Sequence, residues 1–222
     1  MQDKKLTEII YLCAFINRAI LIYAMKNHQG RITGILLAGG MSRRMGRDKA
    51  MIEVDGEYLY RFPLRVLEEL CDRILISTCR DSGFPDIHDR ICDEVEGAGP
   101  MGGLYTCLKK SQTDLNMVIS CDLPMVNEEL MKYLIRESAG YDIAIPAMSP
   151  DKPEPLCGIY RKNLVAPLLQ SLQIGNFAVH SVFPQVRSRI IQIDASMPFY
   201  HPDLFLNINS TADLETFRQC KK

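Results

Sequence analysis

Glycine and positively charged side chains crowd the loop that follows the aliphatic run 32–37. Gly39 and Gly40 let the backbone turn sharply and bring N–H groups close to a bound anion. Four cationic side chains then follow within seven residues: Arg43, Arg44, Arg47 and Lys49. The loop therefore predicts a polyphosphate site. Its glycine spacing matches neither a Walker A loop nor a dinucleotide-binding fingerprint.

A carboxylate, Asp122, directly follows another strand-like run, 116–121. A carboxylate beside a polyphosphate is repulsive unless a divalent cation lies between them, and Mg²⁺ favours one or two carboxylates plus phosphate oxygens. We therefore predict that Asp122 is a ligand of Mg²⁺. The same residue is suited to begin a turn before Pro124, because the proline biases Leu123 toward extended backbone, and the two roles are compatible.

A second glycine-rich segment, 97–103, lies between these two motifs and leads into a helical pattern. Its backbone, unencumbered by side chains, can approach a flat base or a ribose closely. Asp93 follows a short run, 90–92, at the edge of this segment. Taken alone the segment is a flexible turn, but its position after a strand favours nucleotide binding, with Gly99 and Asp93 as candidate contacts.

Short aliphatic runs alternate with helical patterns from Arg31 onward, which predicts right-handed βαβ crossovers and an α/β fold with a mainly parallel sheet covered on both faces. The predicted strands are 32–37, 73–78, 116–121, 142–145, 156–160 and 189–193. The predicted helices are 59–70, 101–110, 128–138 and 162–172. Ligands of such sheets bind at the carboxyl ends of the strands, which is where the cationic loop and Asp122 are expected.

The length and composition of the chain favour one domain. Its 222 residues suffice for a single α/β domain, which we place at 31–222, and we find no internal repeat or linker within it. The formal net charge of -1 provides no global field to attract nucleic acid or an anionic membrane. The 8 cysteines include no C-x-x-C pair and no zinc-type cluster, which favours a reduced, cytoplasmic compartment.

Residues 1–30 form an amino-terminal extension with an apolar stretch. Glu8, Asn17 and Arg18 interrupt this stretch well short of the roughly 20 apolar residues that a membrane span needs. No small-x-small cleavage site follows, so a signal peptide is a poor match. Two interpretations stay open: an amphipathic helix that packs on the domain or on a partner, and a true translation start at Met25.

Four motifs together resemble the molybdenum cofactor guanylyltransferases, which are members of the nucleotidyltransferase superfamily with a Rossmann-like sheet. The motifs are L-A-G-G-x-S-x-R-M-G-x-D-K-A at 37–50, G-P-M-G-G-L at 99–104, C-D-L-P at 121–124 and N-I-N-S-T-A-D-L at 207–214. They span nearly all of the chain after the extension. The resemblance implies a three-layer Rossmann-like nucleotidyltransferase fold.

The resemblance also implies roles for the matching residues. Nucleotide-binding positions are then expected at Leu37, Ala38, Gly39, Lys49, Asp93 and Asp122. The glycine loops themselves add Gly40 and Gly99 as candidate nucleotide contacts. Asp122 would bind Mg²⁺ as well, while Lys49 and Arg43 would offset charge on the triphosphate, so these three are the expected catalytic residues. Some members carry asparagine in the guanosine-binding part where this chain has Ser77, which can donate and accept but has a shorter reach.

The reaction that the resemblance implies joins GMP to a pterin. The terminal phosphate of molybdenum-molybdopterin attacks the α-phosphorus of GTP and expels pyrophosphate. A phosphate with a second pKa of roughly 6 is already ionised at neutral pH, so it needs little help from a base. Expected partners are GTP, molybdenum-molybdopterin, and molybdoenzymes or their chaperones. Two alternatives stay open: a nucleotidyltransferase of the same fold for a cytidylyl or sugar-phosphate acceptor, and a non-catalytic cofactor carrier or nucleotide sensor.

The carboxyl-terminal third carries fewer signals. The segment D-K-P-E-P-L-C-G-I-Y-R, 151–161, belongs to a region that by resemblance helps to receive the second substrate. Asn207 and Asn209 are assigned to substrate as well. Ser210 and Asp213 form a capping box, which predicts the start of the last helix.

Overall fold

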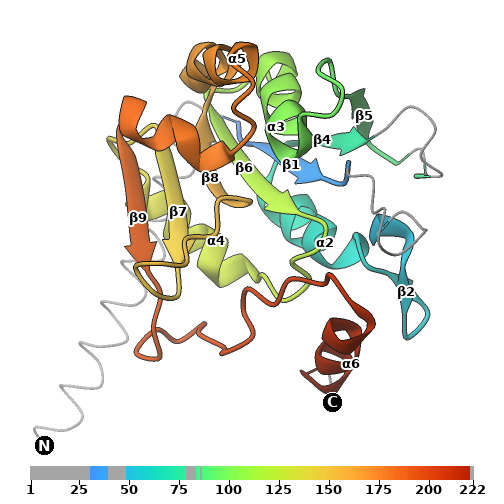
Figure 1. Cartoon of the computed structure of the whole chain (residues 1–222). Helices are drawn as coiled ribbons and strands as arrows, with labels where there is room; N and C mark the ends of the chain where they lie inside the picture. Colours follow the sequence, from blue (N-terminus) through green and yellow to red (C-terminus); the bar gives the residue numbers. More distant parts are fainter. Residues whose placement is uncertain (1–30, 40–48, 79–83, 86, 221–222) are drawn as a thin grey trace, which may run out of the picture. The chain divides into compact units, whose positions relative to one another are not determined.

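The computed structural model describes residues 31–39, 49–78, 84–85 and 87–220 (Figure 1). The chain divides into two units, Met1–Gly30 and Arg31–Lys222, and every described residue belongs to the second. The amino-terminal extension therefore lies outside the described residues, as do Gly40 and Arg43 of the cationic loop. Among the helices that are described, none has the length and apolar character needed to cross a membrane.

A seven-stranded sheet with the order β5-β4-β1-β6-β8-β7-β9 forms the centre of the described unit (Figure 1). Its strands are β1 (Thr33–Leu37), β4 (Arg73–Thr78), β5 (Asp89–Cys92), β6 (Leu115–Ser120), β7 (Ile143–Ala147), β8 (Cys157–Arg161) and β9 (Ser188–Gln192). β8 runs antiparallel to both of its neighbours, and the other strands of this sheet are parallel to one another. The predicted mainly parallel sheet is confirmed.

Helices cover both faces of the sheet, which gives three layers (Figure 1). The helices are α2 (Arg61–Leu70), α3 (Gly99–Lys110), α4 (Glu128–Glu137), α5 (Val165–Gln173) and α6 (Thr211–Cys220), with the short 3₁₀ helices η1 (Lys49–Met51), η2 (Lys162–Leu164) and η3 (Val179–Gln185). Leu36 packs in one core with residues of α2 and α4, while Ile35 and Leu37 pack in the other with residues of α3 and α5. Strand β1 is buried along its whole length because side chains alternate between these two cores.

The elements begin and end for local chemical reasons. Asn127 caps α4, because its side chain accepts a hydrogen bond from the backbone N–H of Leu130 at 2.9 Å. The capping box predicted before α6 is present: the Ser210 N–H donates to Asp213 Oδ2 at 2.7 Å, and the Asp213 N–H donates to Ser210 Oγ at 3.3 Å.

A small hairpin, β2 (Glu53–Val54) and β3 (Glu57–Tyr58), was not predicted from the sequence. Its turn holds Asp55 and Gly56 at φ values of 52° and 82°, the pattern that an Asp-Gly pair favours between antiparallel strands. The hairpin shares a third, smaller apolar cluster with α6, in which Val54 and Phe217 are fully buried.

Candidate functional site

The carboxyl ends of β1, β4 and β6 lie side by side, and they bring the sequence motifs together. The Ala38 N–H donates to the Ser77 carbonyl at 3.0 Å, so the chain leaving β1 is tied to the end of β4. On the other side, the Cys121 N–H donates to the Leu37 carbonyl at 3.0 Å, so the residue before Asp122 is tied to the same chain. The Ala38–Gly39 backbone therefore lies between the end of β4 and Asp122.

Asp93, which follows β5, forms a partly buried pair with Ser77 of β4. The Ser77 hydroxyl donates to Asp93 Oδ1 at 2.7 Å, and only 2% of Ser77 is exposed. Burial raises the pKa of the Asp93 carboxyl, while the hydrogen bond from Ser77 lowers it. Burial that one described donor does not offset is a common feature of carboxylates that bind ligands.

Glycines from both predicted loops enclose this pair. A Cβ atom on Gly103 would lie 2.3 Å from Ser77 Oγ, and one on Gly39 would lie 3.3 Å from the same oxygen. A Cβ on Gly102 would approach the Val95 carbonyl to 3.0 Å. Gly99 begins α3 with a φ of 58°, a left-handed conformation that other residues adopt only with strain. The glycine spacing of 97–103 is therefore explained by close approach and backbone conformation.

Hydrogen bonds hold the segment between Asp93 and α3 in place. The Thr106 hydroxyl donates to the Gly102 carbonyl at 2.9 Å and accepts from the Glu94 N–H at 3.0 Å. Lys109 of the same helix pairs with the Glu94 carboxylate, with Nζ and Oε2 2.6 Å apart. This segment is thus held against α3 and is more than a flexible turn.

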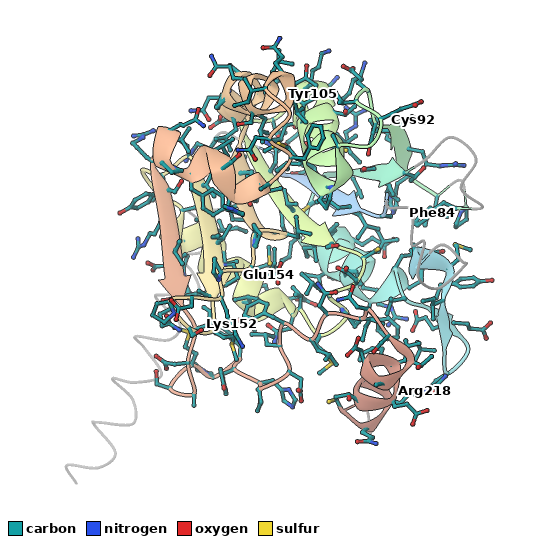
Figure 2. The ribbon with its side chains drawn as sticks, viewed as in Figure 1. Phe84, Cys92, Tyr105, Lys152, Glu154 and Arg218 are labelled. Carbon is teal, nitrogen blue, oxygen red and sulfur yellow. The ribbon has the colours of Figure 1, made fainter. Side chains whose placement is uncertain are left out.

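Glu154 precedes β8 at the same edge of the sheet, because β8 runs antiparallel to β6 (Figure 2). The register pairs Ile119 with Cys157, and the Ser120 N–H still donates to the Leu156 carbonyl at 2.8 Å. Asp122 and Glu154 each lie two residues beyond this hydrogen bond, and the charge of Asp122 acts on the Glu154 carboxyl, so the two side chains are close to each other.

The carboxyl of Glu154 lies in a desolvated position. Its pKa is raised to about 7, chiefly by burial. The hydrogen bond from the Leu156 N–H, 3.3 Å from Oε1, acts to lower the pKa, and the charge of Asp122 acts to raise it. The Glu154 N–H donates to the Pro146 carbonyl at 2.9 Å, which fixes the segment before β8 on β7. A carboxyl held this way beside a second carboxylate is suited to a cation or to a hydrogen-bond donor of a ligand.

The chemistry of these donors fits a divalent cation. Asp122 and Glu154 offer hard oxygen atoms, which Mg²⁺ prefers, at the edge where the glycine loops begin. In the described part of the chain, no group of three or more histidine, cysteine, aspartate or glutamate side chains is arranged to hold a metal ion. A cation at Asp122 would therefore complete its coordination with phosphate oxygens and water, which is the usual arrangement for Mg²⁺ with nucleotides.

The structure brings most of the predicted site residues to one place. The predicted residues that lie at the carboxyl edge are Leu37, Ala38, Gly39, Ser77, Asp93 and Asp122. Gly99 lies where α3 begins. Lys49 begins η1, and its side chain is outside the described residues together with Gly40 and Arg43. The sequence analysis missed Glu154. The signal that could have found it is its place in the segment 151–161, already assigned to the second substrate by resemblance.

The fold and these motifs define a class: a nucleotidyltransferase with a Rossmann-like parallel sheet. A MobA-like NTP transferase domain matches residues 34–186. The chain belongs to this family, which confirms the resemblance to the molybdenum cofactor guanylyltransferases and makes the protein a nucleotidyltransferase enzyme.

Two curated relatives illustrate the similarity. The chain is 31% identical over 184 residues to a protein of Pelotomaculum thermopropionicum named a probable molybdenum cofactor guanylyltransferase, covering 82% of this chain and 89% of that one. A protein of Peptoclostridium acidaminophilum with the same name is 32% identical over 200 residues, covering 84% and 88% of the two chains.

Two solved structures share the fold. Molybdopterin-guanine dinucleotide biosynthesis protein A from Archaeoglobus fulgidus superposes with a TM-score of 0.72 at 24% identity, over 85% of this chain and 98% of that one. The 2-C-methyl-D-erythritol 4-phosphate cytidylyltransferase from Thermus thermophilus gives a TM-score of 0.63 at 14% identity, over 84% and 97%. At these identities the likeness concerns the fold alone.

Proposed function

We propose that the protein transfers GMP from GTP to the terminal phosphate of molybdenum-molybdopterin and releases pyrophosphate. One observation carries the proposal: the Ala38–Gly39 backbone runs between two carboxylates, with Asp93 on the side of β4 and Asp122 next to the end of β1. A nucleoside triphosphate lying along this backbone would meet one carboxylate at its nucleoside and the other at its phosphates.

The roles of the residues follow from their chemistry. Asp93 would accept a hydrogen bond from the nucleoside, and Asp122 would hold the divalent cation, for which we propose Mg²⁺. When bound, the cation neutralises charge on the triphosphate and polarises the α-phosphate. Lys49 and Arg43 would add cationic donors toward the phosphates. The chain's task is then to position the two substrates, which dominates phosphoryl-type transfer because the attacking phosphate is already ionised.

The proposed function is tested by a calorimetric titration of the full chain with GTP, CTP, ATP and UTP, each in the presence of Mg²⁺. We expect the tightest binding for GTP, and weaker GTP binding for Asp122→Ala because the cation is lost. Asp114→Ala is a matched control, since Asp114 immediately precedes the same strand, β6, at its opposite end. A preference for CTP or UTP would move the substrate within the same fold, and no binding at all would favour a cofactor carrier.

The acceptor is tested separately. Pyrophosphate release from GTP should depend on added molybdenum-molybdopterin, and the product should contain both the pterin and GMP by mass spectrometry. Release that proceeds equally well with a sugar phosphate, or only with it, would contradict the pterin as acceptor while leaving the nucleotidyltransferase reaction intact.

A further inference from the structure

Ser77 and Asp93 are hydrogen-bonded to each other, but they differ in how accessible they are to a nucleotide. Ser77 lies on the face of β4 that α3 covers, next to Leu75, which is fully buried in the same apolar core. A hydroxyl in such a position costs free energy unless it is hydrogen-bonded. Its described partner is Asp93 Oδ1 at 2.7 Å.

Neighbouring backbone closely surrounds the Ser77 hydroxyl. The missing Cβ of Gly103 would lie 2.3 Å from Oγ and 3.1 Å from Cβ of Ser77, and the missing Cβ of Gly39 would lie 3.3 Å from Oγ. Backbone therefore encloses the hydroxyl on two sides. With 2% of the residue exposed, Ser77 is not placed to touch a nucleoside itself.

The other carboxylate oxygen of Asp93, Oδ2, lies near Gly39 and Gly102. The Cβ positions on Gly39 and Gly102 lie 3.6 Å and 3.9 Å from Asp93 Oδ2, so this oxygen faces both glycine loops. Because Ser77 occupies Oδ1, Oδ2 is the oxygen best placed to accept a hydrogen bond from a ligand. A carboxylate that is held at one oxygen presents the other in a defined direction, which favours binding by reducing the entropy lost.

We infer that Ser77 is a positioning residue, which holds Asp93 so that Oδ2 points at the nucleoside of the bound nucleotide. Gly103 makes room for the Ser77 hydroxyl, because a Cβ at this position would lie 2.3 Å from Oγ. The inference rests on the proposed function, because it assumes that a nucleoside triphosphate binds along Ala38–Gly39. It changes the role expected for Ser77, which acts through Asp93 and does not read the base.

A double-mutant cycle tests the inference. The dissociation constant of GTP with Mg²⁺ is measured by calorimetry for the wild-type chain, Ser77→Ala, Asp93→Ala and the double variant. We expect Ser77→Ala to weaken binding about 10-fold, the scale of one hydrogen bond to a charged group. The double variant should bind as Asp93→Ala does, because Ser77 has nothing left to position. Steady-state kinetics should show a higher KM for GTP with kcat nearly unchanged.

Two further variants separate positioning from a general effect on the sheet. Ser77→Cys keeps a weak donor in place and should restore part of the affinity. Thr33→Val deletes a fully buried hydroxyl at the opposite, amino end of β1, where it accepts a hydrogen bond from the Thr113 hydroxyl at 2.8 Å, and should leave GTP binding unchanged. Thermal unfolding of each variant confirms that it is folded.

The outcomes distinguish the inference from the proposed function. If Ser77→Ala weakens binding equally in the wild-type and Asp93→Ala backgrounds, or has no effect while GTP still binds, the positioning role is wrong and the proposed function stands. If the wild-type chain prefers CTP, guanine selection is wrong, and the cycle repeated with CTP still decides the role of Ser77. Absence of binding by all four nucleotides would overturn both.

Discussion

The amino and carboxyl edges of the central sheet differ in how many hydrogen-bond donors their carboxylates meet. At the amino edge, Asp142 precedes β7 and accepts hydrogen bonds from the Arg187 guanidinium at 2.9 and 3.1 Å, from the Arg187 N–H at 3.1 Å and from the Asn163 amide at 2.9 Å. These donors, the Arg187 side chain first, hold the pKa of Asp142 well below its usual range. At the same edge, Asp72 accepts from the Ile32 N–H at 2.8 Å.

At the carboxyl edge, burial without matching donors raises the pKa of Asp93 and brings that of Glu154 to about 7. The number of described donors explains the contrast, since Asp142 meets four and the other two carboxyls meet one each. The carboxylate at the amino edge is stabilised by the fold itself, and we propose that those at the carboxyl edge meet their remaining partners in a ligand. Substitutions at the two edges should therefore separate stability from activity.

The largest effect is expected at Asp122. Asp122→Ala should lower turnover of GTP by roughly 100-fold or more, because charge neutralisation by a cation contributes several kcal/mol to such transfers. The midpoint of thermal unfolding should change little, since the side chain is assigned to a ligand. Pyrophosphate release and calorimetric unfolding measure the two quantities. A loss of stability that matches the loss of activity would erase the proposed difference between the edges.

Asp142→Ala should show the reverse. Its four hydrogen bonds would be lost, so we expect the free energy of unfolding to fall by about 2 kcal/mol, the scale for hydrogen bonds to a charged group. The KM for GTP should stay within about twofold of the wild-type value, because Asp142 lies at the far edge. Urea unfolding measures the stability. The free energy of unfolding of Asp142→Asn, which keeps one acceptor, should lie between those of Asp142→Ala and the wild type. Lost GTP binding with unchanged stability would contradict the comparison.

The pH dependence of stability should also separate the edges. Glu154 has its pKa raised from 4.5 to about 7, so the folded state holds its proton more tightly and stability falls as the pH rises through this range. Glu154→Gln removes that cost. In EDTA and without nucleotide, the free energy of unfolding of Glu154→Gln, relative to that of the wild type, should rise by on the order of 1 kcal/mol from pH 5 to pH 8. An equal difference at both pH values would contradict the raised pKa.

The contribution of Asp142 to stability should depend on pH in the opposite direction. Its lowered pKa means that its contribution is present above the pKa of the unfolded chain and is lost as the pH falls below it. The stability gap between the wild type and Asp142→Asn should therefore shrink from pH 6 to pH 3, as measured by urea unfolding. A gap that widens in acid would show that Arg187 and Asn163 do not stabilise the ionised form.

The smallest effect is expected for an exposed ion pair at the amino edge. Arg73 Nε and Asp89 Oδ2 are 2.6 Å apart, with 40% and 51% of the side chains exposed. Water and salt screen such a pair, so Asp89→Ala should cost about 0.5 kcal/mol or less and leave activity unchanged. Urea unfolding at low and high salt is the test. If Asp89→Ala lowers the free energy of unfolding as much as Asp142→Ala does, exposure does not determine how much these charge pairs stabilise the fold.

Much of this architecture could be predicted from local patterns. The predicted strand 73–78 coincides with β4, and the helix predicted at 128–138 differs from α4 by one residue at its end. These predictions succeeded because side-chain periodicity and caps act over a few residues. The hairpin β2–β3 was missed because its strands have two residues each, too few for any periodic pattern.

The sequence by itself determined the α/β class, the glycine loops, and the placement of Gly39 and Asp122 at strand ends, because each depends on neighbouring residues. Only the tertiary structure decided which carboxylates and donors meet. Ser77 and Asp93 are 16 residues apart, and Glu154 lies close to Asp122 because β8 is inserted antiparallel between β6 and β7. Strand order and direction arise from long-range packing of the two cores, which no local pattern contains.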